Sequence, residues 1–216
     1  PEEQKISMNI CSAITIIVLV GKATFWPESI ENVIEMSKTS EQNFIFASMI
    51  LGNINHELDS MLISKRDKEI IIDFLRSYDT LITQFITQIL FDTEKVKKEI
   101  LYKNCLNILL SFANCGVNFI GVDERIPVTL VSSLISFSNL RDLISEVVTE
   151  MIANSSSSKL STKINIKIDN YIPDLMNKCD KKEMHCILEI AKMINNLYLH
   201  YLNKPSFTEE EKDIIF

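Results

Sequence analysis

Apolar side chains recur with the period of an α-helix along most of the chain, and this periodicity constrains the fold more than any other feature. It is clearest over residues 65–91, where apolar residues return at i, i+1, i+4 and i+5 for about six turns. The members are Ile70, Ile71, Phe74, Leu75, Tyr78, Leu81, Ile82, Phe85, Ile86, Ile89 and Leu90. Abundant isoleucine favours strands by propensity alone. The helical period of the apolar residues nevertheless predicts one long amphipathic helix over residues 65–91.

The same period predicts helices on both sides of this segment. Residues 140–152 repeat the stripe after an N-cap at Ser138 or Asn139, and a helix over residues 180–201 begins at the capping residue Asp180. Shorter helices are predicted over residues 3–20, 27–36, 41–55, 94–114, 127–137, 162–177 and from 208 to the end. Gly21 and Gly116 are predicted to end helices, and Pro27 and Pro127 to lie in first helical turns.

One segment is ambiguous, and composition helps to resolve it. Residues 164–168 alternate like a strand, but the isoleucines there also belong to a helical stripe, and their neighbours are helical. Only four glycines and five prolines are present, which leaves few sharp turns for a many-stranded sandwich or barrel. With 46% hydrophobic and 24% charged residues, wholesale disorder is excluded. The chain is predicted to be all-α.

Grouped in pairs, the predicted helices form units that start near residues 3, 41, 93, 139 and 180. Their mean spacing of about 44 residues is typical of two-helix HEAT or armadillo repeats. A single hairpin cannot bury its own apolar surface, so such units stack on their neighbours. The sequence therefore predicts one domain over residues 1–216, a right-handed α-solenoid of about five helical hairpins, although the pattern also fits a compact bundle.

The net charge and the hydropathy of the chain restrict the classes of partner that it can bind. A net charge of −7 argues against a nucleic-acid binder, which needs concentrated Lys and Arg, and is compatible with a basic protein partner. The most apolar run, Ile10–Val20, has about eleven residues where a membrane span needs roughly 20, so no span is predicted.

Five cysteines without C-x-x-C spacing suggest neither a disulfide framework nor a zinc site. They indicate reduced core thiols in an intracellular, reducing compartment.

Catalytic and metal-binding groups are not clustered in the sequence. The histidines are His56, His185 and His200, and none has a nucleophile and an orienting group beside it. His185 and Cys186 are adjacent, so they point to different sides of a helix. We expect no enzymatic activity, no cofactor and no metal site.

Acidic stripes are the remaining functional signal, because a curved stack that grips basic partners needs carboxylates on one face. We predict that partner-binding residues lie on the second helix of a pair, at Glu28, Glu31, Glu35, Glu69, Asp73 and Arg76. The alternative is an ordinary solvated helix face. That alternative is favoured for Asp142, Glu146 and Glu150, which share one side of a first-position helix.

Three segments resemble a known family. They are residues 11–20 followed by Phe25 and Trp26, residues 51–57 followed by residues 66–75, and Ser111-Phe112 followed by residues 116–119. In order and helix length these segments resemble importin-β-type transport receptors (karyopherins), and in particular the transportin-SR and importin-13 branch. The likeness covers most of residues 8–203. Phe112 departs from it, because a Trp is usual at that position.

The resemblance implies a fold and a function. It implies HEAT repeats from the N-terminal half of a longer receptor, of which this chain is a fragment, that bind GTP-loaded Ran and protein cargo on a concave face. Nucleoporins as further partners, and a location in the cytoplasm and nucleus, are also implied. Two alternatives remain open: a HEAT or armadillo scaffold of another pathway, such as a phosphatase or vesicle-coat scaffold, and an all-helical enzyme.

Overall fold

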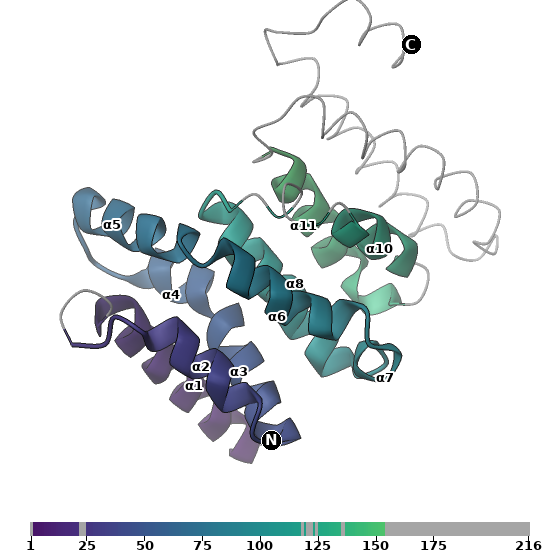
Figure 1. Cartoon of the computed structure of the whole chain (residues 1–216), viewed down its shortest axis with the longest axis horizontal. Helices are drawn as coiled ribbons and strands as arrows, with labels where there is room; N and C mark the ends of the chain where they lie inside the picture. The colour runs from purple at the N-terminus through teal and green to yellow at the C-terminus, as the bar shows by residue number, and fades with distance from the viewer. Residues whose placement is uncertain are drawn as a thin grey trace, which may run out of the picture. The chain divides into compact units, whose positions relative to one another are not determined.

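The regular structure is helical, with no strand, in the part that the computed structural model describes: residues 2–21, 25–117, 119, 123, 125–134 and 137–153 (Figure 1). The all-α prediction is confirmed there. Contacts divide the chain into two compact units, Pro1–Val117 and Asn118–Phe216. The helices predicted over residues 162–177, 180–201 and 208–216 lie outside the described residues.

The first unit contains α1 (Glu2–Gly21), α2 (Ser29–Ser37), α3 (Glu41–Gly52), α4 (Ile54–Ser60), α5 (Lys65–Arg76), α6 (Asp79–Leu90), α7 (Thr93–Val96) and α8 (Glu99–Asn114). Five of these helices form two layers. α3 packs between α1 and α8, while α2 packs on α3 and α6 packs on α8. In Figure 1, α2 and α6 lie nearer the viewer than α1, α3 and α8.

Aromatic and branched side chains fill the space between the two layers. The ring of Phe44 on α3 stacks against that of Phe85 on α6, with centroids 5.0 Å apart. Tyr102 and Phe112 of α8 are almost fully buried, as is Leu51 of α3. Burying large apolar side chains stabilises the fold by about 1.5–3 kcal/mol each, so this shared core ties the layers together.

The prediction of one helix over residues 65–91 is wrong, because the chain turns at Ser77 and Tyr78 between α5 and α6. The backbone N–H of Tyr78 donates to the carbonyl of Leu75 (3.1 Å) in a tighter turn. The Ser77 hydroxyl bonds the carbonyl of Phe74 at 2.7 Å. Contacts with other helices hold the chain on both sides of this turn, as described below, and neither Gly nor Pro marks it in the sequence.

Two more predicted helices are also divided. The helix expected over residues 41–55 ends at Gly52, and α4 continues to Ser60. The helix expected over residues 94–114 is split into α7 and α8 at residues 97–98. Asp92 caps α7 by accepting hydrogen bonds from the backbone N–H groups of Glu94 (3.0 Å) and Lys95 (3.2 Å). These two bonds lower the pKa of the Asp92 carboxyl.

Other boundaries differ by a few residues. α2 begins at Ser29, so Pro27 lies in the turn before the helix and not in its first turn. The predicted starts of α3 and α5 agree with the structure, and N-caps explain both. The side chains of Ser40 and Ser64 accept hydrogen bonds from the backbone N–H groups three residues later, each at 3.1 Å. The ends of α1 at Gly21 and of α8 before Gly116 are as predicted.

Gly116 ends α8 in a conformation that favours glycine. Its φ is +81°, the only positive φ among the described residues. Its N–H donates to the carbonyl of Ala113 (2.7 Å), and the N–H of Val117 donates to that of Phe112 (2.9 Å). This pair of bonds is the Schellman motif, which satisfies the last carbonyls of a helix.

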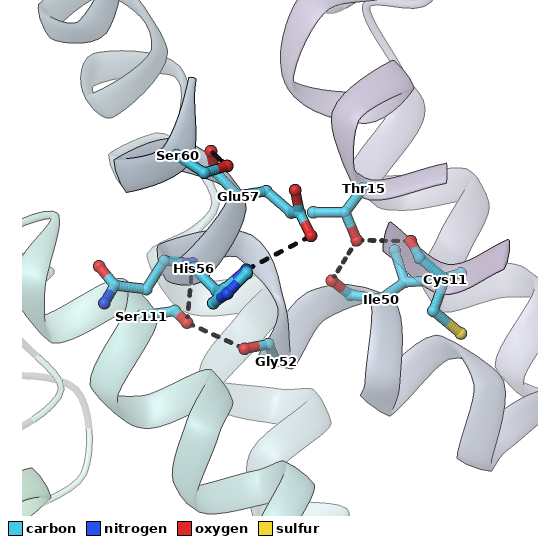
Figure 2. A network of polar contacts seen from close by, with 9 residues as sticks. Cys11, Thr15, Ile50, Gly52, His56, Glu57, Ser60 and Ser111 are labelled. Carbon is cyan, nitrogen blue, oxygen red and sulfur yellow. Dashed lines mark hydrogen bonds and ion pairs between the residues drawn. The ribbon is translucent and has the colours of Figure 1, made fainter. Parts of the chain in front are cut away.

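A seam of hydroxyl groups links α1, α3, α4 and α8 (Figure 2). The Thr15 hydroxyl donates to the carbonyl of Ile50, 3.0 Å away in α3. Ser111 of α8 donates to the carbonyl of Gly52 (3.3 Å) and accepts from the N–H of Asn55 (3.2 Å). These bonds satisfy backbone groups at the break between α3 and α4, so the break is compatible with a buried position.

The described part of the second unit contains α10 (Arg125–Ser133), a 3-10 turn (Ser138–Leu140) and α11 (Arg141–Ala153). The helix predicted from Ser138 or Asn139 therefore begins as a 3-10 turn. Its apolar side is buried, including Val147 and Val148. Arg141 is also buried, and its Nε donates to the carbonyl of Leu134 at 2.8 Å.

Candidate protein-binding surface

Three of the predicted site residues lie along one edge of α2. Glu28 is the N-cap residue and is exposed, Glu31 is half-buried, and Glu35 is exposed in the last turns. The opposite side of α2 is buried at Ile30, Val33 and Ile34, as the helical stripe predicts. We call Glu28, Glu31 and Glu35 the α2 acidic edge.

Tyr78, in the turn between α5 and α6, contacts the turn that precedes α2. Its hydroxyl donates to the carbonyl of Pro27 at 3.3 Å. Burial and the neighbouring carboxylates of Glu31 and Glu28 raise the pKa of Tyr78 to about 12. The Oε2 atom of Glu31 is buried and has no hydrogen-bond partner. The acidic edge therefore begins at a junction between α2 and the α5–α6 turn.

The other end of the acidic edge leads to a recess with internally paired charges. Glu35 forms an ion pair with Lys38. Beside Lys38 is a recess of about 470 Å³ whose walls include Lys98, paired with Glu41, and Lys95, paired with Asp92 at 3.3 Å. The charges of the recess, like that of Glu35, therefore already have partners within the chain.

The three predicted residues of α5 form their own contacts. The Glu69 carboxylate lies 4.0 Å from Lys65 Nζ, and Asp73 lies 3.1 Å from Arg76 Nη1. All four side chains are more than half exposed, so each pair adds only about 0–1 kcal/mol to stability. Glu69 and Asp73 are thus exposed on the surface, and each already has a cationic neighbour within α5.

Arg76 has an additional contact with the end of α8. Its Nε donates to the carbonyl of Cys115 at 2.6 Å. A guanidinium at the C-terminus of a helix is favourable because the last carbonyls carry partial negative charge. Arg76 therefore links α5 to α8, a role that the polar pattern of the sequence did not reveal.

The structure brings only part of the predicted set together. Arg76 precedes Tyr78 by two residues, so the end of α5 adjoins the start of α2 with Glu28 and Glu31. Glu35 lies near the C-terminal end of α2 and Glu69 near the N-terminal end of α5, so both are away from this junction. Tyr78 was missed because it fits the apolar stripe; the polar residues Ser77 and Asp79 on either side of it were the available signal.

A groove of about 460 Å³ between α1, α3 and α8 was also missed. Its walls combine apolar and amide side chains: Met8, Ile45, Phe46, Met49, Ile100, Gln42, Asn53, Asn104 and Asn107, with Ser7, Gly52 and Lys103. Residues 44–51 of α3 are almost entirely apolar around the helix, and one side of such a helix has to remain near the surface when the other is buried. That pattern was the available signal.

The described histidine and cysteines form no reactive cluster. His56 is exposed, with its Nδ1 3.5 Å from the buried Glu57 carboxylate. Cys11, Cys105 and Cys115 are buried and free, and burial raises the pKa of each thiol, which disfavours the nucleophilic thiolate. Among the described residues, no group of three or more potential ligands could hold a metal ion. His185, His200, Cys179 and Cys186 lie outside the described residues.

The polar side of α11 carries a second row of acidic residues. Asp142 and Glu146 are exposed, whereas Glu150 is half-buried. The exposure of the first two residues agrees with the interpretation of a solvated face. No helix in the described ranges has the length and apolar character needed to cross a membrane.

Comparison with protein-family models, curated proteins and solved structures found no match to this chain. The resemblance to importin-β-type receptors therefore stays a prediction that depends on the segments quoted above.

Proposed function

We propose that this chain is a protein-binding segment of stacked helical hairpins, and that it serves in an importin-β-type transport receptor. In this proposal the hairpins form a right-handed HEAT solenoid. The second-position helices contact GTP-loaded Ran or a basic cargo, and nucleoporins are further partners. These partners are bound in the cytoplasm and the nucleus. The proposed activity is binding alone: the partners compete for the same curved surface, and no covalent bond is made or broken.

The observation that carries the proposal is the alternation of helices between two layers in the first unit. α1, α3 and α8 follow one another in one layer, and two of the helices between them in sequence, α2 and α6, pack on the next member of that layer. Stacked hairpins produce this order, because each hairpin contributes one helix to each layer and contacts mainly its neighbours. The family assignment rests on the sequence resemblance alone.

The electrostatics of α2 favour a basic partner, because Glu28 and Glu35 are exposed carboxylates along one edge of this helix. α5 carries exposed charges of both signs, with Glu69 and Asp73 beside Lys65 and Arg76. Exposed charges steer association more than they increase affinity, and salt screens them over roughly 8–10 Å. We therefore expect partner capture to be fast at low salt and slower as the ionic strength rises.

The test is a kinetic titration of the chain with GTP-loaded Ran and with a basic cargo protein at two ionic strengths. The variant carries Glu28→Lys and Glu35→Lys, and leaves Glu31 in place because Glu31 contacts Tyr78. The matched control carries Asp142→Lys and Glu146→Lys, which change the net charge equally on another exposed surface.

We expect the α2 variant to associate at least about tenfold more slowly at low salt, with a weaker salt dependence. The control should change far less. Equal effects of the two variants would assign the result to net charge and not to the α2 acidic edge. Absence of binding by the unmodified chain to Ran and to every basic cargo would contradict the proposed transport function.

A further inference from the structure

An exposed apolar face runs along α1 from Ile6 to Val20. Five large apolar residues on it are 39–55% exposed: Ile6, Ile10, Ile16, Ile17 and Val20. Ala13, in the middle of the helix, is exposed as well. Another side of the same helix is buried, at Cys11, Thr15 and Val18. Large apolar side chains that gather on one face of a helix normally pack against another element, so this exposed face is unusual.

The face is also uncharged. No Asp, Glu, Lys, Arg or His occurs from Ile6 to Gly21, although the chain as a whole carries a net charge of −7. Two copies of an acidic protein repel each other over most of their surfaces. On this face a second copy of the chain is not repelled by like charges. A charged partner would find no opposite charge there with which to form an ion pair.

Four of the five exposed apolar residues are arranged symmetrically about Ala13, and the fifth, Ile17, has the exposed Asn9 at its mirror position. Ile10 and Ile16 lie three residues before and after it, and Ile6 and Val20 lie seven residues before and after it. If two α1 helices cross antiparallel at Ala13, Ile10 of one copy meets Ile16 of the other, and Ile6 meets Val20. The small alanine at the crossing point lets the two backbones approach closely. A two-fold interface needs this self-complementarity, since the same surface serves on both sides.

We propose that α1 is a homodimerisation helix, which pairs antiparallel with α1 of a second copy around a two-fold axis at Ala13. The pairing does not depend on the proposed transport function, since α1 is separate from the α2 acidic edge. A helix of 20 residues is about 30 Å long. One helix pair buries less than the roughly 1,200–2,000 Å² of a standard stable interface, so the dimer should dissociate on dilution.

The experiment measures the mass of the full 216-residue chain by sedimentation over a wide range of concentration. We expect the mass to rise from one to two copies of 24.8 kDa and not beyond. Ala13→Glu places two carboxylates opposite each other on the axis, and should weaken the dimer at least about tenfold. Asn32→Glu adds the same charge at an exposed position of α2, and should leave the dimer unchanged.

A mixing experiment tests the position of the axis. Ala13→Glu mixed with Ala13→Lys should recover a mixed dimer, because opposite charges then meet at the crossing point. Ile17→Glu, at another exposed position of the face, replaces Ala13→Glu if circular dichroism shows that the latter loses helix. The proposal is overturned if the unmodified chain stays monomeric throughout, if the mass grows past two copies, or if the dimer tolerates both glutamates.

Discussion

Replacement of Gly116 by alanine tests how the first unit closes at the end of α8. The φ of +81° costs a residue with a Cβ about 1–2 kcal/mol. The added Cβ would also lie 2.8 Å from Nη2 of Arg76, whose Nε donates to the carbonyl of Cys115. Displacing this half-exposed guanidinium should weaken a charged hydrogen bond and cost about 1 kcal/mol more. We expect Gly116→Ala to lower the free energy of unfolding by about 2–3 kcal/mol.

The assay is denaturant unfolding followed by tryptophan fluorescence. Trp26 is the only tryptophan of the chain and lies in the first unit, so its signal reports on that unit. Gly21→Ala is the control, because Gly21 has no positive φ and its added Cβ meets only the exposed ring of Phe25, which can move aside. It should cost less than about 1 kcal/mol.

A double-mutant cycle with Arg76→Ala separates the two contributions. When the guanidinium is absent, Gly116→Ala should cost only the backbone part, about 1–2 kcal/mol. The reasoning is refuted if the two substitutions are additive, or if Gly116→Ala costs no more than the Gly21→Ala control.

Two further predictions concern a buried stripe and a tyrosine. Val147→Asp, at a side chain with no exposed surface, should cost at least about 3 kcal/mol, whereas the exposed Glu146→Ala should be nearly silent; equal losses in thermal melts would refute the assigned orientation of α11. The pKa of Tyr78 is raised to about 12 in the folded chain, so its neutral hydroxyl contributes stability that is complete below about pH 10 and is lost as the pH rises toward 12. Unfolding followed by Trp26 fluorescence should therefore lose less stability between those pH values in Tyr78→Phe than in the unmodified chain, and equal losses would count against the contact with Glu31.

The sequence predicted the helical class and the buried sides of most helices, because the 3.6-residue period depends only on which side chains avoid water. It also located the helix end at Gly116, where a special backbone conformation requires a glycine. The turn at Ser77 and Tyr78 escaped prediction, since it is held by contacts with Pro27 and Cys115, which are distant in sequence. Local patterns carry no information about such partners.

The candidate surface was predictable only in part for a similar reason. Alternation of charged and apolar residues identified Glu28 and Glu35 as exposed, and both are exposed. The same pattern could not distinguish Glu31, whose Oε2 is buried, from its neighbours on the edge. Nor could it show that Arg76 reaches the end of α8.

Amide hydrogen exchange, with and without GTP-loaded Ran, tests most directly whether α2 and α5 form the partner surface. The chain is kept dilute, so that pairing through α1 does not contribute. We expect slower amide exchange in α2 and α5 when Ran is added, with α1 and α11 unchanged. Exchange that does not slow anywhere, or slows only outside these two helices, would contradict the assignment of α2 and α5 as the partner surface.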